Sequence, residues 1–207
     1  MSIVVEFSGT PDAGKTTVLN SLFSEFKNQG KSVILLDEAN GEKLPPHNLR
    51  GSLAYNEWVG RNACNGIMEA LQKNPDLLLV DRGLLDFRFW NYFYEQNGKA
   101  THEEVKSLQS KPEFNTKALV PDLFLAVTVS LEEAIKRNAS LAQKADWVIN
   151  HNTLFDSFYK CYKGPKATLD TTTLSREEVI SSSLNIIYDK FPELKPTPHK
   201  DVKDIEK

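Results

Sequence analysis

The residues that decide the fold lie near the start of the chain and read Gly9-Thr10-Pro11-Asp12-Ala13-Gly14-Lys15-Thr16. They follow a short β-branched run at 3–7 and precede an amphipathic stretch at 15–28, which Gly30 closes. The order is therefore strand, loop, helix. Two glycines at this spacing before a lysine and a threonine form a P-loop, which binds the phosphates of a nucleoside triphosphate.

Each residue type in this loop has a physical role. Gly9 and Gly14 permit backbone geometry and close approach that a side chain would obstruct. The N–H groups and dipole of the following helix favour an anion. Lys15 would reach the β- and γ-phosphates, and Thr16 would ligate Mg²⁺. We expect eight residues to bind the nucleotide: Gly9, Pro11, Asp12, Ala13, Gly14, Lys15, Thr16 and Thr17.

Strand-like and helix-like segments alternate along the rest of the chain. Apolar runs of strand length occupy 32–36, 77–80, 123–129 and 167–169. Helical patterns occupy 52–73, 84–96, 101–110, 131–142, 153–162 and 175–190, and Thr101, Ser130 and Ser175 precede acidic first turns. This alternation predicts an α/β fold: a P-loop NTPase with three α/β/α layers and a five-stranded parallel sheet covered by helices on both faces.

Length and composition set the domain organisation. A chain of 207 residues fits one domain, which we place at 1–191. Prolines and mixed charges predict a tail over 192–207. Hydrophobic residues at 40% and charged residues at 26% exclude a disordered or fibrous chain. The net charge of -3 disfavours a dominant nucleic-acid surface.

Apolar runs and the spacing of cysteine and histidine set expectations for the cellular compartment and for metal sites. The first strand begins at Ile3 and leaves no room for a signal peptide, and no apolar run approaches the ~20 residues that span a bilayer. We therefore expect a cytoplasmic protein without membrane contact, in which Cys64 and Cys161 are both buried. No zinc site is expected, because the histidines lack partners at ligand spacing: His47, His102, His151 and His199.

A second polar element follows the apolar run 77–80. Asp81 and Arg82 come directly after it, and ligands of open α/β sheets bind at the carboxyl ends of strands. Asp81 is thus placed to hold Mg²⁺ directly or through water, and Arg82 to pair with a phosphate. The alternative is that the two residues only cap the next helix and form a surface ion pair.

With these residues in place, the chain resembles a known family. The P-loop, the Asp81-Arg82 pair and the segment 119–138 are similar to the thymidylate kinase and deoxynucleoside kinase group of P-loop kinases. The run 81–86 followed by Trp90 looks like a set of thymidylate kinase-like ATPases whose acceptor is unassigned. The resemblance covers most of 1–191. It implies a kinase that uses ATP as phosphoryl donor, with Mg²⁺.

The resemblance also indicates a catalytic base. In deoxynucleoside kinases a carboxylate after the second strand orients or deprotonates the attacking hydroxyl, and Asp37-Glu38 stands at that place. We favour Glu38, because strand alternation points the two side chains in opposite directions and the family pattern ends in Glu. A solvated acidic turn is the alternative. The chain departs from the family at Ala39, where many deoxynucleoside kinases have proline.

Kinases of this group carry a lid whose arginines clamp the transferred group, and we expect a short helical lid over about 137–150. Arg137 is the lid candidate, with Lys136 before it and Lys144 beyond it. An arginine that merely complements the helix end is the alternative. The resemblance also places the adenine beside 170–173.

Two aromatic sets are candidates for a nucleobase pocket. Tyr55, Trp58 and Arg61 recur at a spacing of three, and so do Phe87, Trp90 and Phe93 or Tyr94. Stripes of this kind are more often part of a hydrophobic core. The sequence therefore does not decide whether either set faces a ligand.

Together these residues predict phosphoryl transfer from ATP to a small acceptor, a nucleoside, nucleotide or related molecule. The expected catalytic residues are Lys15, Glu38, Asp81, Arg82 and Arg137, with Thr16 and Asp81 as metal ligands. Two alternatives remain open: a nucleotide-dependent switch with a protein partner, and a kinase acting on a nucleic-acid end. Homodimer formation is also left open.

Overall fold

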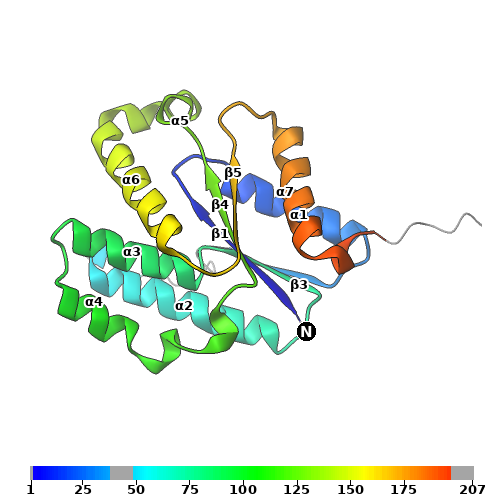
Figure 1. Ribbon diagram of the computed structural model, residues 1–207, viewed down its shortest axis with the longest axis horizontal. Helices are drawn as coiled ribbons and strands as arrows, with labels where there is room; N and C mark the ends of the chain where they lie inside the picture. The colour runs from blue at the N-terminus through cyan, green and yellow to red at the C-terminus, as the bar shows by residue number, and fades with distance from the viewer. Residues whose placement is uncertain (1, 38–48, 197–207) are drawn as a thin grey trace, which may run out of the picture.

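The sheet has five parallel strands, as predicted. The computed structural model describes residues 2–37 and 49–196. Its strands are β1 (Ile3–Gly9), β2 (Val33–Leu36), β3 (Leu77–Asp81), β4 (Leu123–Thr128) and β5 (Lys166–Asp170). Every pairing is parallel, in the order β2-β3-β1-β4-β5, so β1 is central (Figure 1). The loops after the strands therefore emerge at one edge of the sheet.

Helices connect the strands and cover both faces. They are α1 (Lys15–Asn28), α2 (Leu53–Leu71), α3 (Leu84–Gln96), α4 (His102–Gln109), α5 (Leu131–Arg137), α6 (Ala145–Cys161) and α7 (Arg176–Lys190). Short 3₁₀ helices are η2 (Pro112–Phe114), η3 (Lys117–Leu119), η4 (Ala139–Lys144) and η5 (Pro192–Leu194). Thr101 and Ser175 each form a capping box, and the Ser130 hydroxyl caps α5, as their sequence positions predict.

Strand alternation divides the core between the two faces of the sheet. Phe7, Leu79 and Leu125 point to the face covered by α1 and α7. Val4 and Leu78 point to the opposite face, over which α2 and α3 pack, and α6 continues that layer (Figure 1). Because the strands are buried on both faces, they read in the sequence as nearly continuous apolar runs. The three-layer prediction is confirmed.

Two predictions near the carboxyl half are wrong. The helix expected over 131–142 ends at Arg137, because the Asn138 side chain accepts from Ser140 N and starts η4. The helix expected from 153 begins at Ala145. Its first turns contain β-branched residues and asparagine, which are weak helix formers, and burial of Val148 against the core compensates.

Two further details concern surface and tail. Cys161 is exposed, whereas Cys64 is buried, so the expectation of two buried cysteines holds for Cys64 alone. The expected tail begins with η5, and Leu194 in it is buried against the main core.

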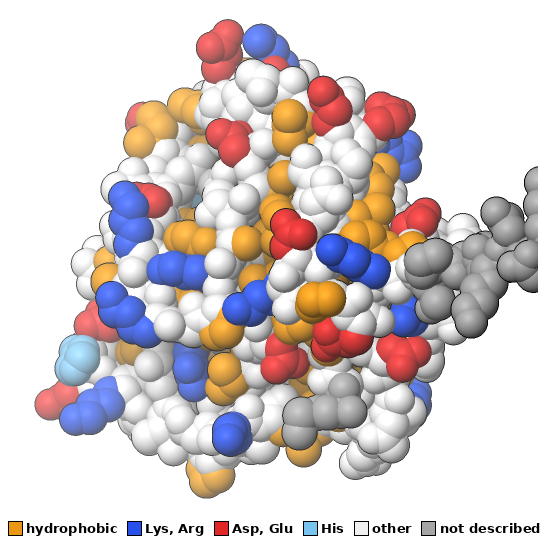
Figure 2. Space-filling model, turned by 45° about the vertical axis from the view of Figure 1, so that its right-hand side comes forward, with side chains coloured by type: hydrophobic (Ala, Val, Ile, Leu, Met, Phe, Trp, Pro, Cys, Tyr) orange, Lys and Arg blue, Asp and Glu red, His pale blue; other side chains and the backbone are white. Residues whose placement is uncertain are grey.

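Acidic and basic side chains are interspersed on the face shown in Figure 2. None of the described helices combines the length and apolar character that crossing a bilayer requires.

Candidate active site

The two glycines of the phosphate loop are required for different reasons. Gly9 has φ 146°, and a Cβ there would lie 1.8 Å from the Val127 carbonyl oxygen of β4. Gly14 has φ 88° and precedes the first residue of α1. Both values lie in the region that L side chains rarely adopt. The loop therefore runs tightly against β4 and then turns at Gly14 into α1.

Lys15 lies against the same loop. Its side chain is buried, and its Nζ donates to the Thr10 carbonyl oxygen at 2.9 Å. Thr10 is held in turn by the Val129 N–H, which donates to its hydroxyl at 3.0 Å. The amine therefore lies over the loop, where an added phosphate would meet it.

Thr16 and Asp81 bring the phosphate loop and β3 together. The Thr16 hydroxyl lies 3.3 Å from Asp81 Oδ2. The other carboxylate oxygen, Oδ1, is buried and has no hydrogen-bond partner in the described part of the chain. Burial raises the pKa of the Asp81 carboxyl, and the positive charges of Arg82 and Lys15 oppose that rise. A buried carboxylate oxygen with a spare lone pair, beside a threonine hydroxyl, fits a Mg²⁺ ligand pair.

The turn after Asp81 is held by a residue that sequence reasoning missed. Glu6 lies in β1, and its carboxylate accepts N–H groups of Gly83, Leu85 and Asp86 at 3.0, 3.1 and 2.8 Å. It thus caps α3, whose first residue follows a glycine without a capping side chain. Burial raises the pKa of the Glu6 carboxyl to about 7. Arg82, just before this turn, has φ 61°, in the left-handed region that is strained for a residue other than glycine.

A buried carboxylate also lies behind the metal ligand pair. Asp86, on the first turn of α3, accepts a hydrogen bond from the Ser8 hydroxyl of β1. Its charge contributes to the raised pKa values of Glu6 and Asp81. Three carboxylates, Glu6, Asp81 and Asp86, therefore lie close together beneath the loop. An acidic residue within an apolar strand, as at position 6, was the sequence signal for this arrangement.

A cavity of about 270 Å³ lies beside the phosphate loop, on the side of α7. Ala13, Gly14 and Thr17 line it from the loop and α1, and Arg137, Thr171 and Leu174 line it from the other side. Arg137 Nη2 donates to the Thr171 carbonyl at 2.7 Å and Nη1 donates to the Asp12 carbonyl at 3.3 Å. The structure thus brings Arg137 and the loop 170–173 together next to the phosphate loop. From the sequence we expected Arg137 to contact the transferred phosphoryl group instead.

The opposite side of the loop is walled by aromatic rings. His151 of α6 is buried, with its ring centroid 5.0 Å from Phe89 and 5.5 Å from Trp90. Burial, together with smaller effects of the Lys15 and Arg82 charges, lowers the pKa of His151 to about 4. The imidazole is therefore neutral near pH 7, and its interaction with the Lys15 charge places it within electrostatic reach of the phosphate loop. Sequence reasoning missed it because α6 was expected to start after it.

The remaining candidates divide between core, surface and the undescribed part of the chain. Phe87, Phe93 and Tyr94 are buried in the core, and Trp90 is half-buried. Arg61 pairs with Glu57 and Glu113 on the outer side of α2. Asp37 follows β2 and is exposed, while Glu38 lies outside the described residues. The choice of catalytic base therefore stays a prediction.

Comparisons with known proteins place the fold and the sequence among nucleotide and nucleoside kinases. No protein-family model matches the chain. Over 155 residues it is 28% identical to a thymidylate kinase of Caldanaerobacter subterraneus subsp. tengcongensis, which covers 69% of this chain and 70% of that protein.

Among solved structures, thymidylate kinase from Candida albicans has a TM-score of 0.69 at 12% identity, covering 94% of both chains. Deoxyadenosine kinase from M. mycoides with bound dCTP has a TM-score of 0.64 at 16% identity, covering 90% of this chain and 100% of that chain. These similarities confirm the fold. In sequence and fold the chain is therefore similar to thymidylate kinases, and in fold it is also similar to deoxynucleoside kinases.

Proposed function

We propose that this chain transfers the γ-phosphoryl group of Mg²⁺-bound ATP to a nucleoside, a nucleotide or a related small acceptor. The observation that carries the proposal is the approach of Thr16 to Asp81, which joins the phosphate loop to the end of β3 with one buried carboxylate oxygen unpaired among the described residues. When bound there, Mg²⁺ would neutralise charge on the β- and γ-phosphates.

The donor nucleotide would place its phosphates on the phosphate loop and its base in the cavity beside that loop. The N–H groups at the start of α1 and the Lys15 amine would hold the phosphates. The 270 Å³ cavity between Gly14 and Thr171 would take the base, with Arg137 against it. A partly apolar cavity next to an arginine suits a purine, because a guanidinium stacks on aromatic faces.

The acceptor would bind on the other side of the phosphate loop, beside the rings of Trp90 and His151. Neutral aromatic rings there offer stacking to a planar base, and Arg82 supplies a positive charge toward the phosphates. Binding donor and acceptor on opposite sides of Lys15 would align them for in-line transfer. Glu38 remains our choice of base, because it matches the family position.

The acceptor assay tests this function. Purified protein is incubated with ATP, Mg²⁺ and each member of a panel of nucleosides and nucleoside monophosphates, and acceptor-dependent formation of ADP is measured. We expect one or a few panel members to stimulate ADP formation, with loss of the stimulation in EDTA. ADP formation that no panel member stimulates would reject the kinase proposal.

A nucleotide-dependent switch is the second candidate, and one observation favours it. Asn138, at the end of α5, donates to the Asp12 carboxylate in the phosphate loop at 3.2 Å. Arg137 donates to the backbone carbonyl of Asp12. Nucleotide binding in the loop would therefore reach α5 directly. A switch of this kind would show slow hydrolysis without an acceptor and a protein partner whose affinity depends on the bound nucleotide.

A further inference from the structure

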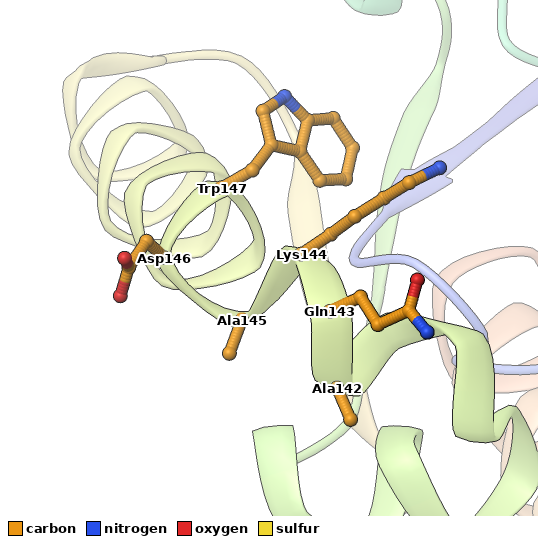
Figure 3. Close-up of a pocket in the computed structure, with 6 residues that line it drawn as sticks. All are labelled: Ala142, Gln143, Lys144, Ala145, Asp146 and Trp147. Atoms are coloured by element: carbon orange, nitrogen blue, oxygen red, sulfur yellow. The ribbon is translucent and has the colours of Figure 1, made fainter.

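Two cavities adjoin the candidate active site. The cavity of about 270 Å³ lies beside the phosphate loop, and another of about 780 Å³ follows residues 142–147 at the start of α6. In Figure 3, Lys144 and Trp147 extend from that segment to the same side, and the Trp147 ring lies 5.3 Å from His151. The larger cavity therefore adjoins the aromatic wall of the site already described.

A third cavity, of about 620 Å³, is lined by residues of α3, α4 and α6 and of the turn after α4. α3 packs against both α4 and α6 (Figure 1). Arg88, Tyr92 and Glu95 line the cavity from α3, at spacings of four and three that put them on one side of the helix. Trp90 comes two residues after Arg88 and so, at 3.6 residues per turn, points to nearly the opposite side. α3 therefore stands between this cavity and the Trp90 side of the active site.

Two cations of this cavity lack an anionic partner. Arg88 is half-buried, and its Nη2 donates to the Phe114 carbonyl at 3.3 Å. Lys106 lines the cavity from α4, and neither it nor Arg88 forms an ion pair within the described part of the chain. Glu95, the acidic residue of the described lining, lies 2.9 Å from His102 Nδ1 instead. Two cations against one carboxylate leave the described lining with a positive charge, which favours an anion.

Two aromatic rings give the same cavity an apolar wall. Tyr92 and Phe158 both line it, and both are half-buried. Their ring centroids lie 6.3 Å apart at an interplanar angle of 33°. Tyr92 comes one turn after Arg88, so the ring and the guanidinium are neighbours on α3. A planar ring could stack on this wall while an anionic group attached to it meets Arg88 and Lys106.

We propose that the cavity between α3, α4 and α6 is a second ligand site, which binds a small anion that carries an aromatic ring. Its volume of about 620 Å³ suits a small molecule. An aromatic phosphate and an aromatic carboxylate share this chemistry, because a guanidinium pairs with either group through two hydrogen bonds. The site is independent of the function proposed above, since its described lining includes no residue of the phosphate loop and neither Asp81 nor Arg137.

Ligand-observed NMR titration tests the site with three probes. 4-Nitrophenyl phosphate and benzoate distinguish the two sources of the anion, and inorganic phosphate lacks the ring. We expect at least one aromatic anion to bind more tightly than inorganic phosphate. Arg88→Gln should weaken its binding by about tenfold, and Lys106→Ala by about threefold, because Lys106 is exposed and its charge is better screened.

Two control variants locate the binding. Lys190→Ala removes an equal charge from α7, on the other face of the sheet, and should bind the aromatic anion as the unaltered protein does. Lys15→Ala should also leave this binding unchanged, whereas an anion held by the phosphate loop would be weakened. Hydrogen exchange gives an independent readout, because the bound probe should protect amides within 88–95 and 102–115 and leave those of 9–17 unchanged.

Three results would overturn the second site. They are the absence of binding by either aromatic anion at millimolar concentration, inorganic phosphate that binds as tightly as both, and affinities of Lys106→Ala and Arg88→Gln that match Lys190→Ala. Arg88→Gln also loses the bond to Phe114, so the exposed Lys106 decides the outcome if that variant does not fold. None of these results bears on phosphoryl transfer at the phosphate loop.

Discussion

Arg137 holds Thr171 with two hydrogen bonds, one to its carbonyl at 2.7 Å and one to its hydroxyl at 3.0 Å. The same hydroxyl donates to the Ala13 carbonyl of the phosphate loop at 3.1 Å. The loop after β5 is therefore fastened to the phosphate loop through one threonine and one arginine. This fastening shapes the cavity that we assign to the base.

Arg137→Ala should therefore weaken nucleotide binding as a whole. We expect ATP and ADP to lose affinity alike, by about tenfold, because the contact shapes the cavity for the base, which both nucleotides carry. Arg137→Lys should recover little, since an ammonium cannot span the Thr171 hydroxyl and carbonyl as a guanidinium does. Calorimetric titration of both nucleotides gives the measurement, with Lys136→Ala as control. A variant with normal affinities and slow turnover would instead support the clamp role expected from the sequence.

Asp81→Asn should raise the stability of the protein and lower its activity. The substitution keeps the shape and an oxygen for Thr16, but it removes a buried anionic oxygen that has no partner among the described residues. Without Mg²⁺ we expect the free energy of unfolding to rise by about 1 kcal/mol, because the amide is neutral and burial penalises a charged group more than a neutral one. Activity should fall by ~10²-fold or more at saturating ATP.

Denaturant unfolding in EDTA and initial rates across Mg²⁺ concentrations measure the two effects of Asp81→Asn. Asn91→Asp is an informative counterpart, because it would add a charge to a buried side chain of α3 away from the phosphate loop and should only destabilise. A fully active Asp81→Asn protein would remove Asp81 from the metal site.

Glu6 should make stability depend on pH near neutrality. Its pKa is raised from 4.5 in the unfolded chain to about 7 in the folded protein, so the folded state holds the proton more tightly. The stabilising effect of that proton is complete below pH 4.5 and is lost as the pH rises toward and through 7. Between these two pH values the free energy of unfolding should fall by about 1.4 kcal/mol per pH unit, or ~3 kcal/mol in all.

The test is the free energy of unfolding from about pH 5 to about pH 8, the window in which this proton is lost, for the unaltered protein and Glu6→Gln, whose amide cannot titrate. The variant should show a flatter curve over this window. Carboxyls whose pKa values are lowered, such as Glu57 and Glu178, change stability at lower pH and do not overlap. Parallel curves for the two proteins would show that Glu6 does not titrate there.

Much of the fold was predictable because its determinants are local. The β-branched run before Gly9 makes a strand, the glycines and Lys15 make the loop, and Thr101 and Ser175 cap their helices from within three residues. In a parallel sheet, the carboxyl ends of β1 and β3 must then meet, which brings Asp81 to Thr16. The approach of the phosphate loop to Asp81 could thus be predicted from local sequence, whereas the nucleotide-binding roles of these residues stay predictions.

The rest depends on contacts between distant segments. Glu6 finds its N–H partners about 80 positions away, and nothing beside it in sequence indicates a cap. His151 lies among aromatic rings of α3. The start of α6 could not be predicted, because the residues before His151 are weak helix formers. The direction of Arg137 was also undetermined, since both the loop after β5 and the transferred group offered it partners.

The most direct test of phosphoryl transfer follows the γ-phosphate itself. Protein is incubated with Mg²⁺ and γ-³²P-labelled ATP in the presence of the acceptor that stimulates ADP formation, and the products are separated. We predict label in the phosphorylated acceptor, reduced by ~10²-fold or more in Lys15→Ala. Label appearing only in inorganic phosphate, or an unchanged rate in Lys15→Ala, would contradict transfer from a nucleotide held by this loop.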